Sequence, residues 1–390
     1  MPARSVYLDH AATTPVDPRV LAAMLPHFSE NYGNPSSVHT YGQQAESALE
    51  HAREQVSLVL GCRPEEVIFT ASGSESDNLA LRGAAFAERQ RRGADTLLVS
   101  AVEHPAVLKT ARQLQQEFGF RLVVLPVDAH GLVSPATLAE HLLPQVAIVS
   151  ILYANNEIGT IHPIAPLAAM CRQRGVAFHT DAVQAASQLP VDVGELGVDL
   201  LALGAHKFYG PKGVGVLYVR DGFGLLPWLT GGGQEQGRRP GTHNVPLAVG
   251  LAEALALTAA ERAARNAHQQ RLRDLIISAV LDRVDGARLT GHPGERLPNH
   301  ASFVFPEVDG NALLAALDAR GFACSSGSAC KSGTPEPSEA LLALGLPPDL
   351  ALGSLRVTVG KDTDSLAVER FLDTLPQVVA TLRRSAGPTR

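Results

Sequence analysis

Two strand-like segments near the middle of the chain are each followed by a charged side chain. Asp181 follows the apolar run 176–180, and Lys207 follows the next run, 200–203. A lysine amine can form a Schiff base with pyridoxal 5'-phosphate, and a carboxylate beside the protonated ring nitrogen keeps that ring an electron sink. The chain has only five lysines, so few residues could fill the first role. The pair therefore predicts a site for this cofactor.

Polar residues that could complete such a site follow other apolar runs. Run 67–70 leads into a Gly/Ser-rich turn that includes Ser74, whose hydroxyl and neighbouring N–H groups suit a phosphate. The same turn also fits an ordinary helix N-cap, and that alternative stays open. His206, beside Lys207, is a second candidate for the phosphate, and His104, after run 96–100, could stack on the ring.

A segment of small residues later in the chain carries two of the four cysteines. It runs from Cys324 through Cys330 to Gly333 and is predicted to be a loop. A thiol on a mobile loop can approach a substrate, act as a nucleophile and move away again. The alternative is a flexible linker with an incidental cysteine. The other two, Cys62 and Cys171, lie in apolar helical settings typical of small core residues.

These residues require a scaffold that brings several strand ends to one place. Short apolar runs alternate with helical patterns between about residues 65 and 220, which predicts an α/β domain with a mostly parallel sheet. In such a sheet, functional groups gather at the carboxyl ends of the strands. The expected strands are 67–70, 96–100, 121–126, 146–152, 176–180, 200–203 and 214–219, and the expected helices are 75–91, 106–117 and 164–174.

The pattern changes after Thr242. A long helical region is expected over 245–281, followed by a smaller second α/β unit. We therefore expect a large cofactor-binding domain over 16–254, and a small domain made of 1–15 and 255–390 that carries the mobile cysteine loop at about 324–337. In the small domain, strands are expected at 302–305 and 354–359, and helices at 312–319 and up to about residue 383.

Composition excludes several other classes of protein. Of the 390 residues, 45% are apolar and 18% charged, so the chain can bury a globular core and is not disordered. A net charge of -6 and only 5% aromatic residues argue against nucleic acid as a partner. No Cys/His spacing predicts a metal site, and no apolar run reaches the roughly 18 residues of a membrane span. The few cysteines favour a cytoplasmic location.

The motifs together resemble those of cysteine desulfurases of the NifS/IscS type, which belong to the class V branch of fold-type I pyridoxal-phosphate enzymes. The most specific is Ser-Ser-Gly-Ser-Ala-Cys at 325–330, which resembles the long-loop group of that family. The other matching segments are 7–15, 33–37, 75–78, 103–104, 155–159, 181–184, 206–207, 209–213, 231–235, 241–242 and 355–356.

The resemblance implies a role for each site residue. It makes three residues catalytic: Lys207 as the Schiff-base lysine, His104 as a group that stacks on the ring and moves protons, and Cys330 as the thiol that accepts sulfur. Arg356 should bind the substrate carboxylate, helped by Asn34. The remaining cofactor contacts that it implies are Asp181 at the ring nitrogen, Gln184 at the ring hydroxyl, Gly73, Ser74 and His206 at the phosphate, Thr242 at the phosphate from the other subunit of a homodimer, and Asn156, which also contacts the cofactor.

The activity implied is conversion of L-cysteine to L-alanine, with sulfur passed to Cys330 and then to an iron–sulfur scaffold or a tRNA-thiolation protein. Selenocysteine lyases and small-amino-acid aminotransferases of the same class are alternatives, and so is a non-enzymatic sulfur carrier. The chain departs from the family pattern at Ser74, where a Thr is usual, and at Gly204, where a Ser is usual. Gln236, Pro240 and His243 also differ from the common residues.

Overall fold

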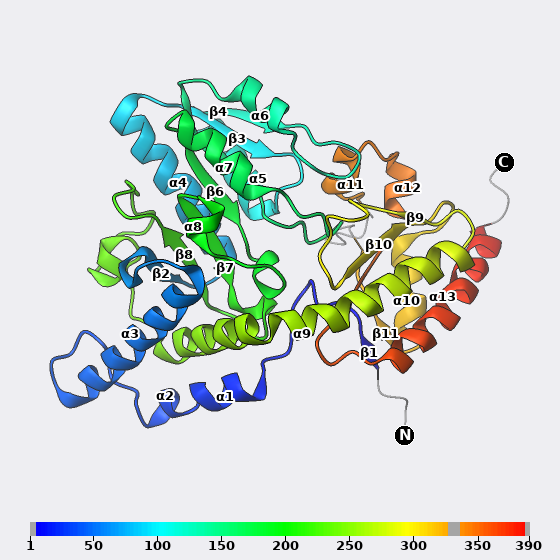
Figure 1. Cartoon of the computed structure of the whole chain (residues 1–390), viewed down its shortest axis with the longest axis horizontal. Helices are drawn as coiled ribbons and strands as arrows, with labels where there is room; N and C mark the ends of the chain where they lie inside the picture. The colour runs from blue at the N-terminus through cyan, green and yellow to red at the C-terminus, as the bar shows by residue number, and fades with distance from the viewer. Residues whose placement is uncertain (1–4, 327–335, 387–390) are drawn as a thin grey trace.

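The centre of the fold is a seven-stranded sheet. The computed structural model describes residues 5–326 and 336–386, which Figure 1 traces in colour from blue to red. The strands lie in the spatial order β2-β8-β7-β6-β5-β3-β4. They are β2 (Val67–Thr70), β3 (Thr96–Ser100), β4 (Arg121–Leu125), β5 (Val146–Ser150), β6 (Ala177–Asp181), β7 (Leu200–Gly204) and β8 (Gly215–Val219).

The sheet is mostly parallel, which confirms the fold class predicted from the alternation of strands and helices. β4, β3, β5, β6 and β7 run parallel to one another, whereas β8 is antiparallel to both β7 and β2. Apart from β4, every strand of this sheet is buried along its whole length, and such strands have continuous apolar runs. The segments after β3, β5, β6 and β7 consequently meet at one edge.

Two of the helices that cover the sheet begin directly after a strand. In α4 (Gly73–Arg92), the Ser72 hydroxyl accepts the N–H of Glu75 at 3.1 Å and so caps the helix. In α5 (Pro105–Phe118), Nδ1 of His104 accepts the N–H of Ala106 at 3.1 Å. Both caps stand at the carboxyl edge of the sheet, so helix N-termini and their free N–H groups face the same edge as the strand ends.

One long helix, α9 (Val245–Arg283), connects two hydrophobic cores. Its first part, which includes Leu251 and Leu255, packs in the core under the sheet, and a later part, which includes Leu272 and Ile276, packs in a second core. In Figure 1 the helix runs below the sheet and on into the second region. The domain boundary expected at 254/255 falls inside this helix, and the division there stays a prediction.

The second core lies between a small sheet and two helices. β9 (Arg288–Leu289), β10 (His300–Val304) and β12 (Ser354–Thr358) form an antiparallel sheet, against which α10 (Gly310–Asp318) and α13 (Ser365–Ala386) pack. The N-terminal strand β1 (Val6–Tyr7) pairs with β11 (Phe322–Ala323) beside them. The start of the chain is therefore held next to residues more than three hundred positions later.

The remaining helices were largely not predicted. The longest of them, α3, has buried residues three or four positions apart and packs along α9. Across residues 5–326 and 336–386, no helix combines the length and the apolar character needed to cross a membrane. These helices are α1 (Pro18–Met24), α2 (Pro26–Ser29), α3 (Thr40–Leu60), α6 (Pro135–His141), α7 (Ile164–Gln173, expected at 164–174), α8 (Val193–Leu196), α11 (Glu339–Ala343) and α12 (Pro348–Leu352).

Candidate active site

A cavity of about 200 Å³ lies at the carboxyl edge of the large sheet. It is formed by the segments that follow β2, β3, β5, β6 and β7, as expected for a parallel sheet. Most of the cofactor-site residues expected from the sequence line it, together with Ser72, Asp77, Leu152, Ala154 and Val183. The expected ones are Gly73, Ser74, His104, Asn156, Asp181, Gln184, His206 and Lys207.

Lys207 lies in a short 3₁₀ turn directly after β7, and its amine reaches back to the N-terminal segment. Nζ donates hydrogen bonds to the carbonyl oxygens of Ala11 at 2.6 Å and Ala12 at 2.8 Å. Burial, followed by the positive charge of Arg356, lowers the pKa of Lys207 to about 8. A substantial part of this amine is therefore neutral near pH 8, as a nucleophilic lysine requires.

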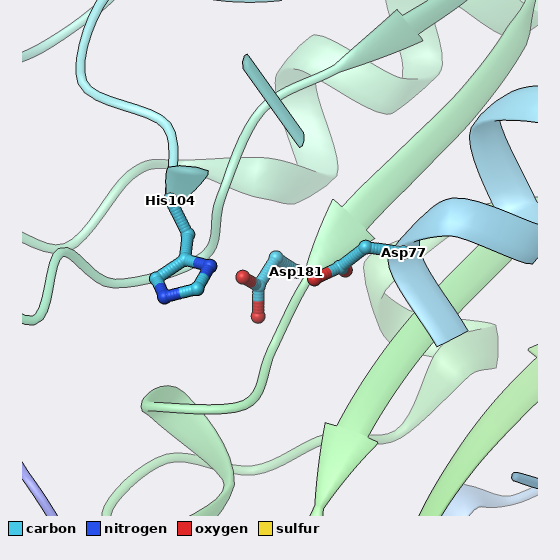
Figure 2. Close-up of side chains that lie close together, drawn as sticks. All are labelled: Asp77, His104 and Asp181. Atoms are coloured by element: carbon cyan, nitrogen blue, oxygen red, sulfur yellow. The ribbon is translucent and has the colours of Figure 1, made fainter. Parts of the chain in front are cut away.

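Asp181 is the last residue of β6, and its carboxylate lies at the inner end of the cavity. Oδ1 accepts the N–H of Val183 at 2.8 Å. Figure 2 shows this carboxylate between the ring of His104 and the carboxylate of Asp77, and single atoms of the three side chains lie within 4.8 Å of one another. Burial raises the pKa of Asp181, whereas His104, the Val183 N–H and Lys207 lower it.

At the phosphate end of the expected site, two glycines leave little room for a side chain. A Cβ on Gly73 would come within 2.5 Å of Val183 Cγ2, so this position accepts only glycine without a shift of Val183. A Cβ on Gly204 would lie 3.3 Å from Val183 Cγ1, a tight contact that needs a small shift of Val183, and the glycine also lacks the hydroxyl donor of a serine. Ser72 is the N-cap, which leaves the first N–H groups of α4 and the side chain of Ser74 for an anion.

Two further cavity residues have polar atoms available for a bound group. His206 Nδ1 pairs with Thr13 Oγ1 at 3.1 Å, and burial lowers the pKa of its imidazole to about 4, so the ring is neutral. Gln184 is buried, yet its Oε1 has no hydrogen-bond partner within the described part of the chain. A buried amide oxygen without a partner is costly, and a donor on a ligand would satisfy it.

The residues present therefore fit pyridoxal 5'-phosphate. The cavity offers a buried carboxylate for a ring nitrogen and a lysine that can lose its proton and form a Schiff base. It also offers a helix N-terminus with small residues for a phosphate. It also has an unpaired amide oxygen on Gln184, which suits a ring hydroxyl.

Arg356 lies near the cavity on β12, which belongs to the second core. Its guanidinium donates to Asp9 Oδ1 at 2.8 Å and to the carbonyl oxygen of Asn156 at 2.9 Å, and the residue is 6% exposed. Its Nε is buried with no partner within residues 5–326 and 336–386. Through its bond to Asn156, which lines the cavity, Arg356 lies beside the cavity, and its charge lowers the pKa of Lys207.

The cysteine segment begins beside Arg356. The backbone N–H of Arg356 donates to Ser325 O at 2.7 Å, and the N–H of Ser325 donates back to Arg356 O at 3.3 Å. Cys324 follows β11 and contacts the second core, and burial raises the pKa of its thiol. Cys330 lies outside the described residues.

Two expected site residues do not reach the cavity within one chain. Thr242 is exposed and follows the turn at Gly241. Asn34 is also exposed, and its Oδ1 accepts the N–H of Ser36 at 3.0 Å. For Thr242 this agrees with a role in a second subunit. The roles of both residues stay predictions.

Sequence reasoning missed a buried ionic cluster that holds the segment with Thr242. Arg53 donates to both oxygens of Glu235 at 2.8 and 2.9 Å, Phe69 N–H donates at 3.0 Å, and His243 Nε2 lies 2.8 Å from Oε1. Glu235 has φ of 47°, which is unusual for a residue other than glycine. Hydrogen bonds within this cluster hold that backbone in place.

The chain is similar to known proteins along nearly its whole length. The family described as aminotransferase class-V matches residues 6–371. The chain belongs to this family. A cysteine desulfurase IscS from Methanosarcina thermophila is 43% identical over 386 residues, which is 99% of this chain and 95% of the relative. A cysteine desulfurase from Gluconacetobacter diazotrophicus is 42% identical over 380 residues, covering 97% of this chain and 94% of the relative.

Solved structures agree with these relatives. A NifS-like protein superposes with a TM-score of 0.90 and 35% identity over 97% of this chain and 100% of its own. A structure described as SspA in complex with cysteine has a TM-score of 0.79 and 34% identity, covering 91% of this chain and 99% of its own. The resemblance to NifS/IscS-type enzymes noted from the sequence is thereby confirmed.

Proposed function

We propose that this protein is a pyridoxal-phosphate-dependent cysteine desulfurase, a sulfurtransferase that converts L-cysteine to L-alanine. The observation that carries the proposal is that Lys207 and Asp181 line one cavity and that Arg356 lies beside it, bonded to the carbonyl oxygen of the cavity residue Asn156. The first two are the groups that the cofactor needs, and the third suits an amino-acid carboxylate. Relatives named cysteine desulfurase along nearly the whole chain support the choice of substrate.

Different residues of the chain carry out different parts of the reaction. When bound, pyridoxal 5'-phosphate supplies an electron sink for the charge that develops on the substrate's carbon skeleton. Lys207 would hold the cofactor covalently, and once the amino group of cysteine has displaced it, the freed amine can take the proton from the substrate Cα. Asp181 would accept a hydrogen bond from the protonated ring nitrogen, and His104 would stack on the ring.

Arg356 orients the substrate. Its guanidinium is held by Asp9 and by the carbonyl oxygen of Asn156, so the side chain has a fixed direction before cysteine binds. Its remaining N–H donors can bind the substrate carboxylate in a charge-assisted pair. Asn34 is proposed to assist it.

Cys330 is proposed as the sulfur acceptor. Its thiolate attacks the substrate sulfur, a new S–S bond forms, and the Cβ–S bond breaks. The electron pair of that bond stays with the carbon fragment, which takes up protons and becomes L-alanine. The persulfide left on Cys330 then passes to an acceptor protein, either an iron–sulfur scaffold or a tRNA-thiolation protein, in the cytoplasm. A small-amino-acid aminotransferase has no use for this thiol, and a selenocysteine lyase would act on the selenium analogue.

A homodimer is part of the proposal. Thr242 lies outside the cavity of its own chain, and a series of large apolar side chains around α1, α2 and the start of α3 is exposed to solvent. They are Leu21, Leu25, Phe28, Tyr32, Val38 and Tyr41, between 48% and 90% exposed. A second copy that covers this face would bury them and could bring its Thr242 to the phosphate.

Mixed dimers test that arrangement. The Lys207→Ala protein, inactive alone, and the Thr242→Ala protein, weakly active alone, are unfolded and refolded together with the cofactor. If Thr242 acts across the interface, the hybrid contains one site with both residues intact, and activity returns. If Thr242 acts within its own chain, both sites of the hybrid are defective and no activity returns.

The cofactor assignment has its own test. The purified protein loaded with pyridoxal phosphate is reduced with borohydride and digested, and the peptides are analysed by mass spectrometry. Attachment to Lys207 supports the proposal, and attachment to Lys212 or another lysine would make the site assignment wrong.

A further inference from the structure

Asp77 lies behind Asp181 at the inner end of the cavity. It comes from the second turn of α4 and is 1% exposed. A carboxylate oxygen of Asp77, one of Asp181 and a ring nitrogen of His104 lie within 4.8 Å of one another. In Figure 2 the Asp77 carboxylate is on the far side of Asp181 from His104, toward α4. Two buried carboxyl groups therefore share one end of the site.

Among the described residues, Asp77 forms no ion pair with a Lys or an Arg, and the basic groups beside it are the histidines His179 and His104. Its Oδ1 has no hydrogen-bond partner within the described part of the chain, and His179 Nε2, 3.6 Å away, is the nearest basic atom found beside it. His179 is fully buried, its Nδ1 pairs with Ser150 Oγ at 2.8 Å, and burial lowers its pKa to about 3. The His179 ring is consequently neutral and cannot balance a carboxylate charge.

Two further neighbours of Asp77 are acidic. Asp181 faces it from β6, and Glu103, buried after β3, adds a third carboxyl group. Glu103 Oε1 accepts the N–H of Leu152 at 2.7 Å, whereas its Oε2 has no partner within residues 5–326 and 336–386. Burial, and then the charges of Asp181 and Glu103, raise the pKa of Asp77 well above its usual value.

Asp181 is better placed than Asp77 to be the ionised member of the pair. Val183 N–H donates to it at 2.8 Å, and His104 and Lys207 both favour its charged form. Two like charges a few ångströms apart in a buried site repel strongly, so such a pair retains one proton. The contacts place the charge on Asp181 and the proton on Asp77.

We propose that Asp77 is a positioning residue that carries a proton behind Asp181, so that Asp181 is the ionised partner of the cofactor's ring nitrogen. The inference rests on the proposed function only for the role of Asp181 toward the cofactor. If Asp77 were ionised instead, Asp181 would be pushed toward its neutral form and would lose the charge that keeps the ring nitrogen protonated.

The first test measures stability against pH in the apoprotein. A carboxyl group with a raised folded-state pKa binds more protons folded than unfolded, so the parent loses stability as pH rises above about 4 toward that folded-state pKa. Asp77→Asn, a neutral side chain of the same shape, removes this loss. The folding equilibrium constant of Asp77→Asn relative to the parent should therefore increase up to about tenfold per pH unit between pH 5 and 7.5.

Asp318→Asn, which removes an exposed carboxylate, is the matched control and should give a nearly flat ratio. A ratio for Asp77→Asn that stays flat or falls with pH would mean that Asp77 is ionised, and would overturn the inference. Because no cofactor is present, this result is independent of the proposed function.

Infrared spectroscopy gives a second readout that does not need Asp77→Asn to fold. In the apoprotein near pH 7.5, the Glu103→Gln variant should still show the C=O band of a protonated carboxyl group, and no such band in that variant would overturn the inference. Where Asp77→Asn folds, adding it to Glu103→Gln should reduce that band by the contribution of one carboxyl group. With ¹⁵N-labelled pyridoxal phosphate, the ring nitrogen should stay protonated in Asp77→Asn and lose its proton in Asp181→Ala. A deprotonated ring nitrogen in Asp77→Asn would contradict the positioning role.

Discussion

Arg356 donates a hydrogen bond to the carboxylate of Asp9 at 2.8 Å, although the two residues are 347 positions apart in the chain. β1 pairs with β11, which brings Asp9 to the small sheet. Arg356 is the middle residue of β12. The pair thus joins the N-terminal segment, which also accepts the Lys207 amine, to the strand expected to bind substrate. The position of the second core therefore determines where a substrate carboxylate can bind.

Replacement of Arg356 should act mainly on substrate binding. Arg356→Lys keeps the charge but loses the planar arrangement of donors, and loss of one or two charge-assisted hydrogen bonds corresponds to a roughly 10- to 100-fold higher KM for cysteine. Steady-state kinetics measure this change. Arg320→Lys on the surface is the control and should leave KM unchanged. An unchanged KM in Arg356→Lys would mean that another residue binds the carboxylate.

Cofactor attachment should depend on pH through the lysine amine. Because burial and Arg356 lower the pKa of Lys207 to about 8, the neutral amine becomes dominant above that pH. The rate at which apoprotein forms its covalent cofactor complex should rise about tenfold per unit below pH 8 and level off above it. Stopped-flow absorbance follows the reaction. A rate that keeps rising toward pH 10 would show an amine with an ordinary pKa.

The two cysteines of the loop segment should differ in function. Cys324 has a raised thiol pKa in a half-buried position beside the second core, so it is a poor nucleophile at neutral pH. Cys324→Ser should keep most of the activity. Cys330→Ser should still bind cysteine but release sulfide on the order of 100-fold more slowly, because it lacks the acceptor thiol. Mass spectrometry after incubation with cysteine should find the added sulfur on Cys330; its presence only on Cys324 would reverse the assignment.

The Glu235 cluster should contribute to stability at neutral pH. Burial alone would raise the pKa of Glu235, but hydrogen bonds from His243 and Arg53 lower it to about 2. A carboxylate whose folded-state pKa is lowered contributes stability above its unfolded-state pKa of about 4.3, and loses it as pH falls toward 2. Glu235→Gln removes the buried ionic partner of Arg53 and leaves it only the more exposed Glu50 and the carbonyl oxygen of Val67, so at pH 7 it should cost up to about 3–5 kcal/mol of unfolding free energy.

Urea unfolding at pH 7 and at pH 4 measures this effect. The difference between the parent and Glu235→Gln should shrink at the lower pH. Glu65→Gln, at an exposed position on the rim of the same region, is the control and should change the unfolding free energy by less than about 0.5 kcal/mol. A Glu235→Gln protein as stable as the parent at pH 7 would show that the cluster does not stabilise the fold.

The sequence predicted the parts of the site that depend on strand ends. Asp181 and Lys207 follow buried apolar runs, and a parallel sheet brings such ends together whatever the details of packing. The seven strands were located within two residues for the same reason. Arg356 was expected only from the family resemblance, because it lies inside a strand, and no local pattern shows which face of β12 is near the cavity.

Other features depend on tertiary contacts that no local pattern reveals. Asp77 occupies an ordinary helical position, and only the packing of α4 against β6 shows that it is buried beside Asp181. Glu235 belongs to a Gly-rich segment, and its partner Arg53 lies on a helix that was not predicted. Thr242 and Asn34 do not reach the cavity within one chain, so their roles depend on how two copies assemble.

The most direct test of the proposed activity is the set of products formed from L-cysteine. The cofactor-loaded protein is incubated with cysteine and a thiol reductant, and alanine, sulfide, pyruvate and ammonia are quantified over time. The account predicts alanine and sulfide in equal amounts, both abolished in Lys207→Ala and nearly so in Cys330→Ser. Formation of pyruvate and ammonia, or turnover of cysteine without sulfide, would contradict it.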